Sequence, residues 1–254
     1  MGKVFERIIN NRALKQIEMS QAQAGGRKGR ATVDHLLILK ELITKAKEEK
    51  RAIYIAFLDV TKAYDKAWLD AIMYVMHKSG LRDTLWQIIK TLNENLTAKL
   101  ITKYGMTRDI KIKDSIRQGG VLSVIQYALL IDEINKEIEK YGFEGLGEGI
   151  GEIIAYCLLW MDDVALIATE PDNLQTMLNI TNEIANRYHI EFGEPKTRIL
   201  KIGNDKKTIT FKLGDMIIKY TDKYKYLGEI INKMNNLKDQ IQQIKGKTEA
   251  AFQT

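Results

Sequence analysis

Apolar positions at helical spacing divide much of the chain into amphipathic helices. Residues 3–18 place Val4, Phe5, Ile8, Ile9 and Leu14 at near-helical intervals. A second helix follows a glycine-rich loop, and Thr32 or Asp34 is its expected N-cap. Further helices are predicted over 61–80, over 81–96, from Gly120 to about Gly142, over 172–189 with Asp172 or Asn173 as its cap, and over 235–252.

Shorter apolar runs predict strands between these helices. Residues 52–60, AIYIAFLDV, form a nearly continuous apolar run that is typical of a strand buried on both faces, and Asp59 comes at its end. Alternating residues about Tyr104–Gly105 predict a hairpin. Short strands are also expected over 197–203, 208–214, 216–220 and 223–231. Helices among strands, with a strand-rich end, indicate an α+β or mixed α/β fold with helices packed on a sheet.

An acidic pair interrupts the apolar run LLWMDDVALIA, residues 158–168. Asp162 and Asp163 repel each other and lose hydration there, so they stay ionised only with cations, donors or solvent nearby. One interpretation is therefore a metal site. The other is a tight acidic turn between two strands, because Asp tolerates turn geometry. Taken alone, the pair favours the turn, at the tip of a hairpin.

Composition narrows the classes of function. Apolar residues make up 45% of 254 residues, enough for a folded core. The single cysteine, Cys157, excludes an internal disulfide, and the three dispersed histidines do not suggest zinc. With no signal peptide and no apolar stretch of spanning length, we expect an intracellular protein, in the cytoplasm or nucleus and without a membrane partner.

The charge balance is mildly basic, since 39 Lys and Arg against 33 Asp and Glu give 39 − 33 = +6. Such a balance suits a polyanionic partner, but it is also that of a merely soluble, slightly basic protein. The loop GGRKGR, residues 25–30, concentrates three cations. It is interpreted either as a phosphate contact or as a solvated surface loop.

Three carboxylates could meet at one edge of the sheet. The buried strand ends on Asp59, and the hairpin tip carries Asp162 and Asp163. If these strands are neighbours, their oxygens suit Mg²⁺, and a pair of such ions can support phosphoryl transfer.

Several segments, in order, resemble the motifs of reverse transcriptases, most closely those of non-LTR (LINE-type) retrotransposons. The three central ones are FLDVTKAYDKAW, SIRQGGVLS and WMDDVALIA. QAGGRKGRATVDHLLILKELI resembles the segment upstream of them, EPKTRILKIG the lysine motif, and YKYLGEII the turn that supports the primer. The resemblance extends from about residue 3 to the final helix.

The resemblance implies an α+β polymerase palm, an antiparallel sheet with helices packed on one face. Residues 1–50 would be partial fingers, 51–230 the palm with inserted finger and palm helices, and 231–254 the start of a thumb or a connecting helix. The thumb would be largely absent, so we expect a fragment whose activity in isolation is open. Trp160 and Val124 depart from the residues usual at their places in the family.

The resemblance also implies a catalytic set. Asp59 and Asp162 would be the principal ligands of two Mg²⁺ ions, for which Mn²⁺ is a possible substitute. Asp163 would be a third carboxylate, and the main-chain carbonyl of Val60 would complete a shell. Lys196 would protonate or neutralise the departing pyrophosphate, although a surface lysine at a strand end is an equal alternative.

Other positions would meet an RNA template, a DNA primer and deoxynucleoside triphosphates. Tyr64 would select deoxynucleotides by crowding the sugar 2′ position, unless it is a packed helix aromatic. The remaining expected contacts are Arg117, Gln118 and Gly119 with the nucleotide, Gly120 beneath the nascent base pair, Arg27, Lys28 and Arg30 with template phosphates, and Tyr226, Leu227 and Gly228 with the primer end. The oligomeric state is left open.

Three functions compete on this reading. The first is an RNA-directed DNA polymerase domain that works by two-metal nucleotidyl transfer. The second is an inactive retroelement remnant that only binds nucleic acid. The third, an unrelated two-metal nuclease, uses the same carboxylates but leaves the RQGG and YLG segments unexplained.

Overall fold

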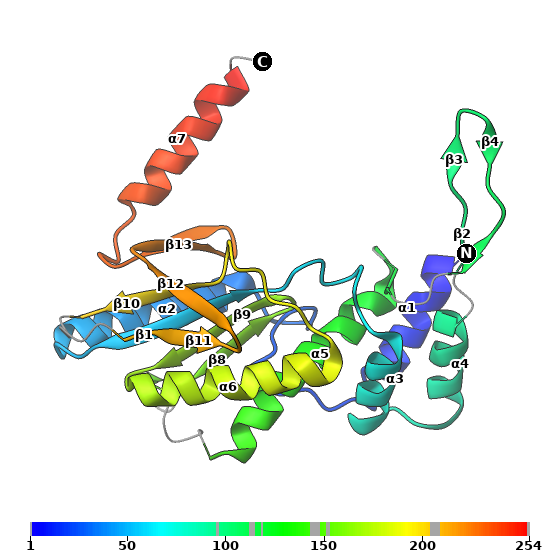
Figure 1. The fold of residues 1–254 in the computed structure, drawn as a ribbon, viewed down its shortest axis with the longest axis horizontal. Helices are drawn as coiled ribbons and strands as arrows, with labels where there is room; N and C mark the ends of the chain where they lie inside the picture. Colours follow the sequence, from blue (N-terminus) through cyan, green and yellow to red (C-terminus); the bar gives the residue numbers. More distant parts are fainter. Residues whose placement is uncertain are drawn as a thin grey trace.

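A computed structural model describes residues 2–94, 97–111, 115–117, 119–142, 148–150, 153–203 and 209–252 (Figure 1). The helices are α1 Gly2–Ala13, α2 Thr32–Glu48, α3 Leu69–Lys78, α4 Asp83–Glu94, α5 Val121–Lys140, α6 Pro171–Tyr188 and α7 Lys238–Phe252. The strands are β1 Ile53–Asp59, β2 Thr97–Ala98, β3 Ile101–Thr102, β4 Gly105–Met106, β5 Ile110–Lys111, β6 Glu148–Ile150, β7 Ile153–Ala155, β8 Cys157–Trp160, β9 Asp163–Ala168, β10 Arg198–Ile202, β11 Phe211–Leu213, β12 Met216–Thr221, β13 Lys223–Tyr226 and β14 Glu229–Asn232.

A six-stranded sheet forms the centre of the fold, in the order β11-β12-β10-β1-β9-β8. Its strand pairs are antiparallel except for β10 and β12, which run parallel. The sheet is therefore mixed, and not antiparallel throughout as we expected. The chain reverses twice, into β11 and again into β12, so β12 returns in the direction of β10 and joins its free edge.

Strand β1 is buried on both faces, as its apolar run predicts. Tyr54, Ala56 and Leu58 belong to a large core with residues of α3, α5 and α6. Ile53, Ile55 and Phe57 belong to a second core with α2 and the β13–β14 hairpin. The expectation that helices cover one face is therefore wrong, because the alternating side chains of β1 are apolar on both sides and each side needs a cover.

Helix boundaries depart from the predictions where local contacts compete. Residues 61–66 form turns, so the helix predicted over 61–80 begins at Leu69. In α2 the N-cap is Ala31, whose N–H donates to Asp34 Oδ2 at 2.9 Å. In α6 the N-cap is Glu170, because Pro171 occupies the first turn. Neither proposed pair of caps is therefore correct.

The predicted hairpins are confirmed. β3 pairs with β4 across Lys103 and Tyr104, and β8 pairs with β9 across Met161 and Asp162. Among the helices of the described ranges, none is both long and apolar enough to cross a lipid bilayer.

His35 joins α2 to the β13–β14 hairpin inside the second core. Its Nδ1 lies 3.2 Å from the hydroxyl of Tyr226, and the two rings stack at 6.4 Å. The rings of His35 and Trp160 form a T-shaped pair with centroids 5.7 Å apart. Burial lowers the pKa of His35 to about 4, with Asp34 opposing and Arg30 reinforcing this effect.

This buried imidazole predicts a loss of stability in mild acid. The unfolded chain binds a proton at His35 near pH 6.5, whereas the folded chain resists until about pH 4. The free energy of unfolding should therefore fall by about 3 kcal/mol across that window, through this residue. Urea denaturation at several pH values measures it. His35→Gln should lack this component, whereas His77→Gln, at an exposed histidine, should keep it; equal pH slopes in all three proteins would contradict the assignment.

Candidate active site

Two acidic strand ends lie side by side at one end of the sheet. β1 and β9 pair with Asp59 directly opposite Asp163, although the two are more than a hundred positions apart in sequence. Met161 and Asp162 form the turn between β8 and β9, with Met161 at φ 58°. The pairing of the strands therefore brings the three predicted carboxylates to one region, and their roles stay predictions.

The three carboxylates repel one another. Burial, then Asp162 and Asp59, raise the pKa of Asp163 to about 6. Burial is also the largest cause that raises the pKa of Asp162, and the charge of Asp59 adds to it, while a hydrogen bond to its own backbone opposes both. Lys196 is the nearby cation, with Nζ 3.2 Å from Asp59 Oδ1. This lysine side chain is 72% exposed, so it neutralises the cluster weakly.

The segment before β10 holds the end of β1 in place. The carbonyl of Asp59 accepts the N–H of Gly193 at 2.8 Å, and Val60 forms an antiparallel bridge with Phe192. A Cβ at Gly193 would lie 2.8 Å from Thr61 Oγ1 and 3.4 Å from Asp59 Oδ2. A side chain at Gly193 would therefore crowd the Thr61 hydroxyl beside the carboxylate, and the same segment continues to Lys196.

The carboxylates suit a hard cation in charge and donor type, but not as a preformed cage. Among the described residues, no group of three or more His, Cys, Asp or Glu side chains is arranged to hold a metal ion. Burial is the largest cause that raises the pKa of Tyr224, and the charges of Asp59 and Asp163 add to it. The charge of Asp162 instead adds to burial in raising the pKa of Tyr64 and of Tyr127. The mutual repulsion of the three is the observation that favours a cation.

Tyr64 lies in the turns after β1 and not on the helix that we expected. Its ring stacks on Tyr127 with centroids 5.3 Å apart, and its carbonyl accepts the N–H of Ile116 at 3.0 Å. Burial first, then the charge of Asp162, raise the pKa of its phenol. The structure thus places Tyr64 beside the acidic turn and ties it to the RQGG segment.

The RQGG segment precedes α5 and is held by α1. The N–H of Val121 donates to Glu6 Oε2 at 2.8 Å, and Arg117 Nη1 lies 3.3 Å from Glu6 Oε1. The carbonyl of Arg117 accepts hydrogen bonds from Gly120 and Ser123. Gly119 has φ 76°, and Gln118 lies outside the described residues.

The glycine-rich loop packs against β8, and its cations differ in availability. Arg27 Nη1 donates to the carbonyls of Ser20 and Gln23 at 2.7 and 3.1 Å, so its guanidinium is engaged in holding the loop together. Lys28 is exposed, and Arg30 bonds to Gln21. Lys28 and Arg30 therefore fit the predicted phosphate contacts better than Arg27.

Tyr226 is an anchor of the second core. It is 1% exposed, tilts against Phe57 with ring centroids 5.3 Å apart and faces His35. Leu227 and Gly228 form the two-residue turn between β13 and β14, with φ of 46° and 89°. Because the Tyr226 side chain is buried, the turn that follows it is the more accessible part of the predicted primer contact.

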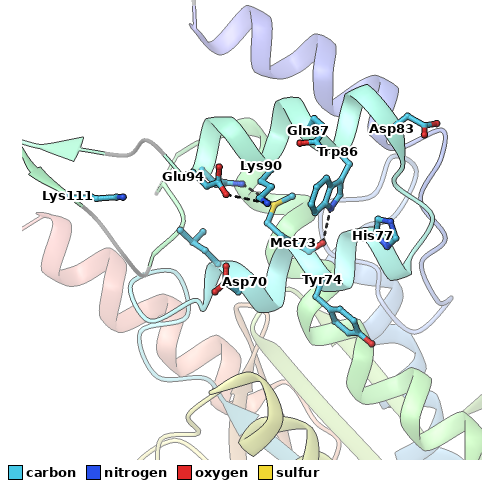
Figure 2. Close-up of a pocket in the computed structure, with 12 residues that line it drawn as sticks. Asp70, Met73, Tyr74, His77, Asp83, Trp86, Gln87, Lys90, Glu94 and Lys111 are labelled. Atoms are coloured by element: carbon cyan, nitrogen blue, oxygen red, sulfur yellow. Dashed lines mark hydrogen bonds and ion pairs between the residues drawn. The ribbon is translucent and has the colours of Figure 1, made fainter.

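A large groove lies elsewhere, between α3 and α4 (Figure 2). Its volume is about 1060 Å³, and none of the three clustered carboxylates lines it. Trp86 Nε1 donates to the carbonyl of Met73, and Lys90 lies over the Trp86 ring. Its lining contains both acidic and basic side chains, Asp70, Asp83, Glu94, Lys90 and Lys111. The charge of the groove therefore does not favour one class of ligand.

Sequence reasoning missed Gln23, Glu6 and Gly193. Each acts through a contact more than a hundred residues away, at Met161, Val121 and Asp59 respectively. A single glutamine, glutamate or glycine within a helix or loop carries no local signal for such a contact.

The chain is similar in sequence to several known proteins. The family model described as "Reverse transcriptase (RNA-dependent DNA polymerase)" matches residues 1–231. The RNA-directed DNA polymerase from mobile element jockey of Drosophila funebris is 28% identical over 247 residues, which cover 92% of this chain and 26% of that protein. The Pol polyprotein from the type-1 retrotransposable element R2 of Nasonia vitripennis is 25% identical over 240 residues, covering 90% and 23%.

Among solved structures, apo telomerase from Candida tropicalis, truncated from its C-terminal domain, has the same fold. The TM-score is 0.57 at 15% identity, covering 91% of this chain and 43% of that one. The telomerase of the same organism in complex with a fragment of telomeric RNA gives 0.59 at 16% identity, covering 91% and 35%. The chain spans about a quarter of the length of the curated relatives it matches. It belongs to the reverse transcriptase (RNA-dependent DNA polymerase) family.

Proposed function

We propose that this chain is the RNA-directed DNA polymerase domain of a non-LTR retrotransposon. It would extend a DNA primer on an RNA template from deoxynucleoside triphosphates. The observation that carries the proposal is the register that sets Asp59 opposite Asp163, with Asp162 in the adjoining turn. The jockey protein to which it is similar is an RNA-directed DNA polymerase by name, and the R2 protein is a Pol polyprotein of a retrotransposable element.

The carboxylates take the central role in this proposal. Asp59 and Asp162, with Asp163 as a third carboxylate and the carbonyl of Val60, would hold two Mg²⁺ ions, with Mn²⁺ as a possible substitute. Such ions, when bound, lower the pKa of an attacking hydroxyl and neutralise a triphosphate. Lys196 is exposed and already next to Asp59, so its ammonium can reach a departing pyrophosphate.

The surrounding residues would position the substrates. Tyr64 would crowd the sugar of an incoming nucleotide, and the charge of Asp162, which contributes to its raised pKa, supports this role. Arg117, Gln118 and Gly119 would contact that nucleotide. Lys28 and Arg30 would bind template phosphates, while Gly120 would lie beneath the base pair and the Leu227–Gly228 turn would meet the primer.

The division of the chain into subdomains follows from the same proposal. Residues 1–50 would be part of the fingers, 51–230 the palm, and 231–254 the start of a thumb or a connecting helix. Figure 1 shows α7 projecting from the body beyond the β13–β14 hairpin, as a helix at such a boundary would.

Primer extension tests the proposed activity. The chain is incubated with a labelled DNA primer on an RNA template, four deoxynucleoside triphosphates and Mg²⁺ or Mn²⁺. Asp162→Asn should reduce the extension rate roughly 10²- to 10³-fold, because it removes a carboxylate from the charged site. Asp215→Asn, in the exposed β11–β12 turn, is the matched control and should extend normally.

The outcomes separate the candidate functions. Metal-dependent extension that is lost in Asp162→Asn supports the polymerase. Salt-dependent binding of the template and primer without extension supports the alternative, an inactive retroelement remnant that only binds nucleic acid. Shortening of the primer, with loss of this activity in Asp162→Asn, would indicate a nuclease instead.

The same cluster predicts a gain of stability where charge is removed. Burial and the neighbouring carboxylates disfavour ionised Asp163 in the folded chain. Without metal at about pH 8, Asp163→Asn should therefore raise the free energy of unfolding by roughly 1 kcal/mol, a value discounted for partial exposure. At about pH 3.5 the folded carboxyl is protonated and the unfolded one mostly so, and the gain should therefore fall close to zero. Urea denaturation of Asp163→Asn and Asp215→Asn at both pH values measures this; a loss of stability at pH 8 would contradict it.

A further inference from the structure

A projecting ribbon, residues 97–111, carries apolar side chains that pack against neither hydrophobic core. It consists of the β2–β5 and β3–β4 pairs and extends away from the body in Figure 1. Tyr104 at its tip is 89% exposed and Ile101 is 84% exposed. Leu100, Met106 and Ile110 are exposed as well. Apolar side chains gathered on an element that buries none of them mark an interaction surface.

The ribbon is also basic. It carries Lys99, Lys103, Arg108 and Lys111 against the single acid Asp109, so 4 − 1 = +3 over these residues. Lys103 Nζ lies 4.9 Å from the centre of the Tyr104 ring. Lys99 is the cation next to Asp109, at 3.7 Å with both side chains exposed. A cation beside an exposed aromatic face fits a partner that offers a flat π-system next to a phosphate.

We propose that this ribbon binds single-stranded nucleic acid. Tyr104 stacks on an unpaired base, and Lys103 and Arg108 contact the phosphates beside it. An unpaired strand fits better than a duplex, because a base in a duplex does not offer its face to a side chain. The inference rests on the proposed function for the identity of the strand, and it adds a contact remote from the acidic turn.

Fluorescence anisotropy with labelled single-stranded RNA and DNA of about 16 nucleotides tests the ribbon. Tyr104→Ala should weaken binding roughly 5- to 150-fold, which corresponds to the loss of one stacked base. Lys103→Gln combined with Arg108→Gln should lower the slope of log affinity against log salt by about 1.4. Tyr141→Ala, at an exposed tyrosine after α5, and Lys212→Gln are the controls and should bind like the unmodified chain.

Binding by the ribbon variants that equals that of the unmodified chain would overturn the proposal, whether or not the chain extends primers. The same holds if the unmodified chain binds no single strand, or if Tyr104→Ala weakens duplex and single strand alike. A failed extension assay with the expected binding losses would count against the polymerase proposal alone.

A second, independent observation concerns Gln23, which is fully buried beside the acidic turn. Its Oε1 accepts the N–H of Gly25 at 2.9 Å and the N–H of Met161 at 3.2 Å. Its Nε2 donates to the carbonyl of Ala128 in α5 at 3.3 Å. One side chain thus connects the glycine-rich loop, the turn before Asp162 and the helix that follows RQGG.

The backbone around Gln23 is fitted to the same hairpin. Ala24 donates to the carbonyl of Leu159, and Leu159 donates to the carbonyl of Ala22, both at 2.9 Å. A Cβ at Gly25 would lie 2.5 Å from the nitrogen of Met161. Met161 adopts φ 58°, which costs a non-glycine residue about 1–2 kcal/mol and so needs outside support.

We infer that Gln23 is a positioning residue for Asp162 and that it acts through the amide of Met161. This inference also rests on the proposed function. Gln23→Met keeps the length of the side chain but removes its hydrogen bonds. Gln175→Met is the matched control, because the amide group of Gln175 also donates to and accepts from a backbone, that of Lys212 in β11.

Hydrogen exchange and steady-state kinetics test this role together. In Gln23→Met the Met161 amide should exchange about tenfold faster, while the amides of β1 keep their protection. The rate constant kcat should fall roughly 10- to 100-fold, with the KM for deoxynucleotides nearly unchanged. Unchanged exchange at Met161, a loss of protection throughout β1, or an unchanged kcat would each overturn the inference. If the unmodified chain extends no primer, the polymerase proposal fails and the exchange result alone decides whether Gln23 holds the turn.

Discussion

The antiparallel register between β1 and β9 is the constraint on which the rest of this structure depends. It sets Asp59 opposite Asp163. Because the side-chain period of a strand is two, a slip by one residue would turn every apolar side chain of β1 to the opposite face. Both cores are built on this alternation. The apolar residues that fold the sheet therefore also fix where the carboxylates lie.

That arrangement stores electrostatic repulsion at the end of the sheet. Asp162 and Asp163 both have raised pKa values, and each is raised in part by another acid of the cluster. Lys196 offsets the repulsion only partly, since its side chain is largely exposed. A fold that keeps three mutually repelling carboxylates loses stability there, which is the pattern expected where charge serves a ligand or a reaction.

The sequence predicted those parts of the fold that depend on local pattern. The apolar run ending on Asp59, the hairpin tip at Asp162 and the long helix after Gly120 are all present. The turns around Tyr64 were missed, because they depend on pairing with Ile116 and Glu191. The buried place of Tyr226 and the contact of Gln23 with Met161 were missed for the same reason. Residues distant in sequence impose these positions, and no local pattern records them.

A double-mutant cycle between Asp59 and Asp163 tests the central claim most directly. The free energy of unfolding is measured at low salt, without metal and at about pH 8, for the unmodified chain, Asp59→Asn, Asp163→Asn and the double variant. If the two carboxylates face each other across β1 and β9, each single change relieves the same repulsion. The double variant then gains less than the sum, by roughly 0.5–1 kcal/mol. Strict additivity would contradict the account, because it would mean that the two charges do not meet.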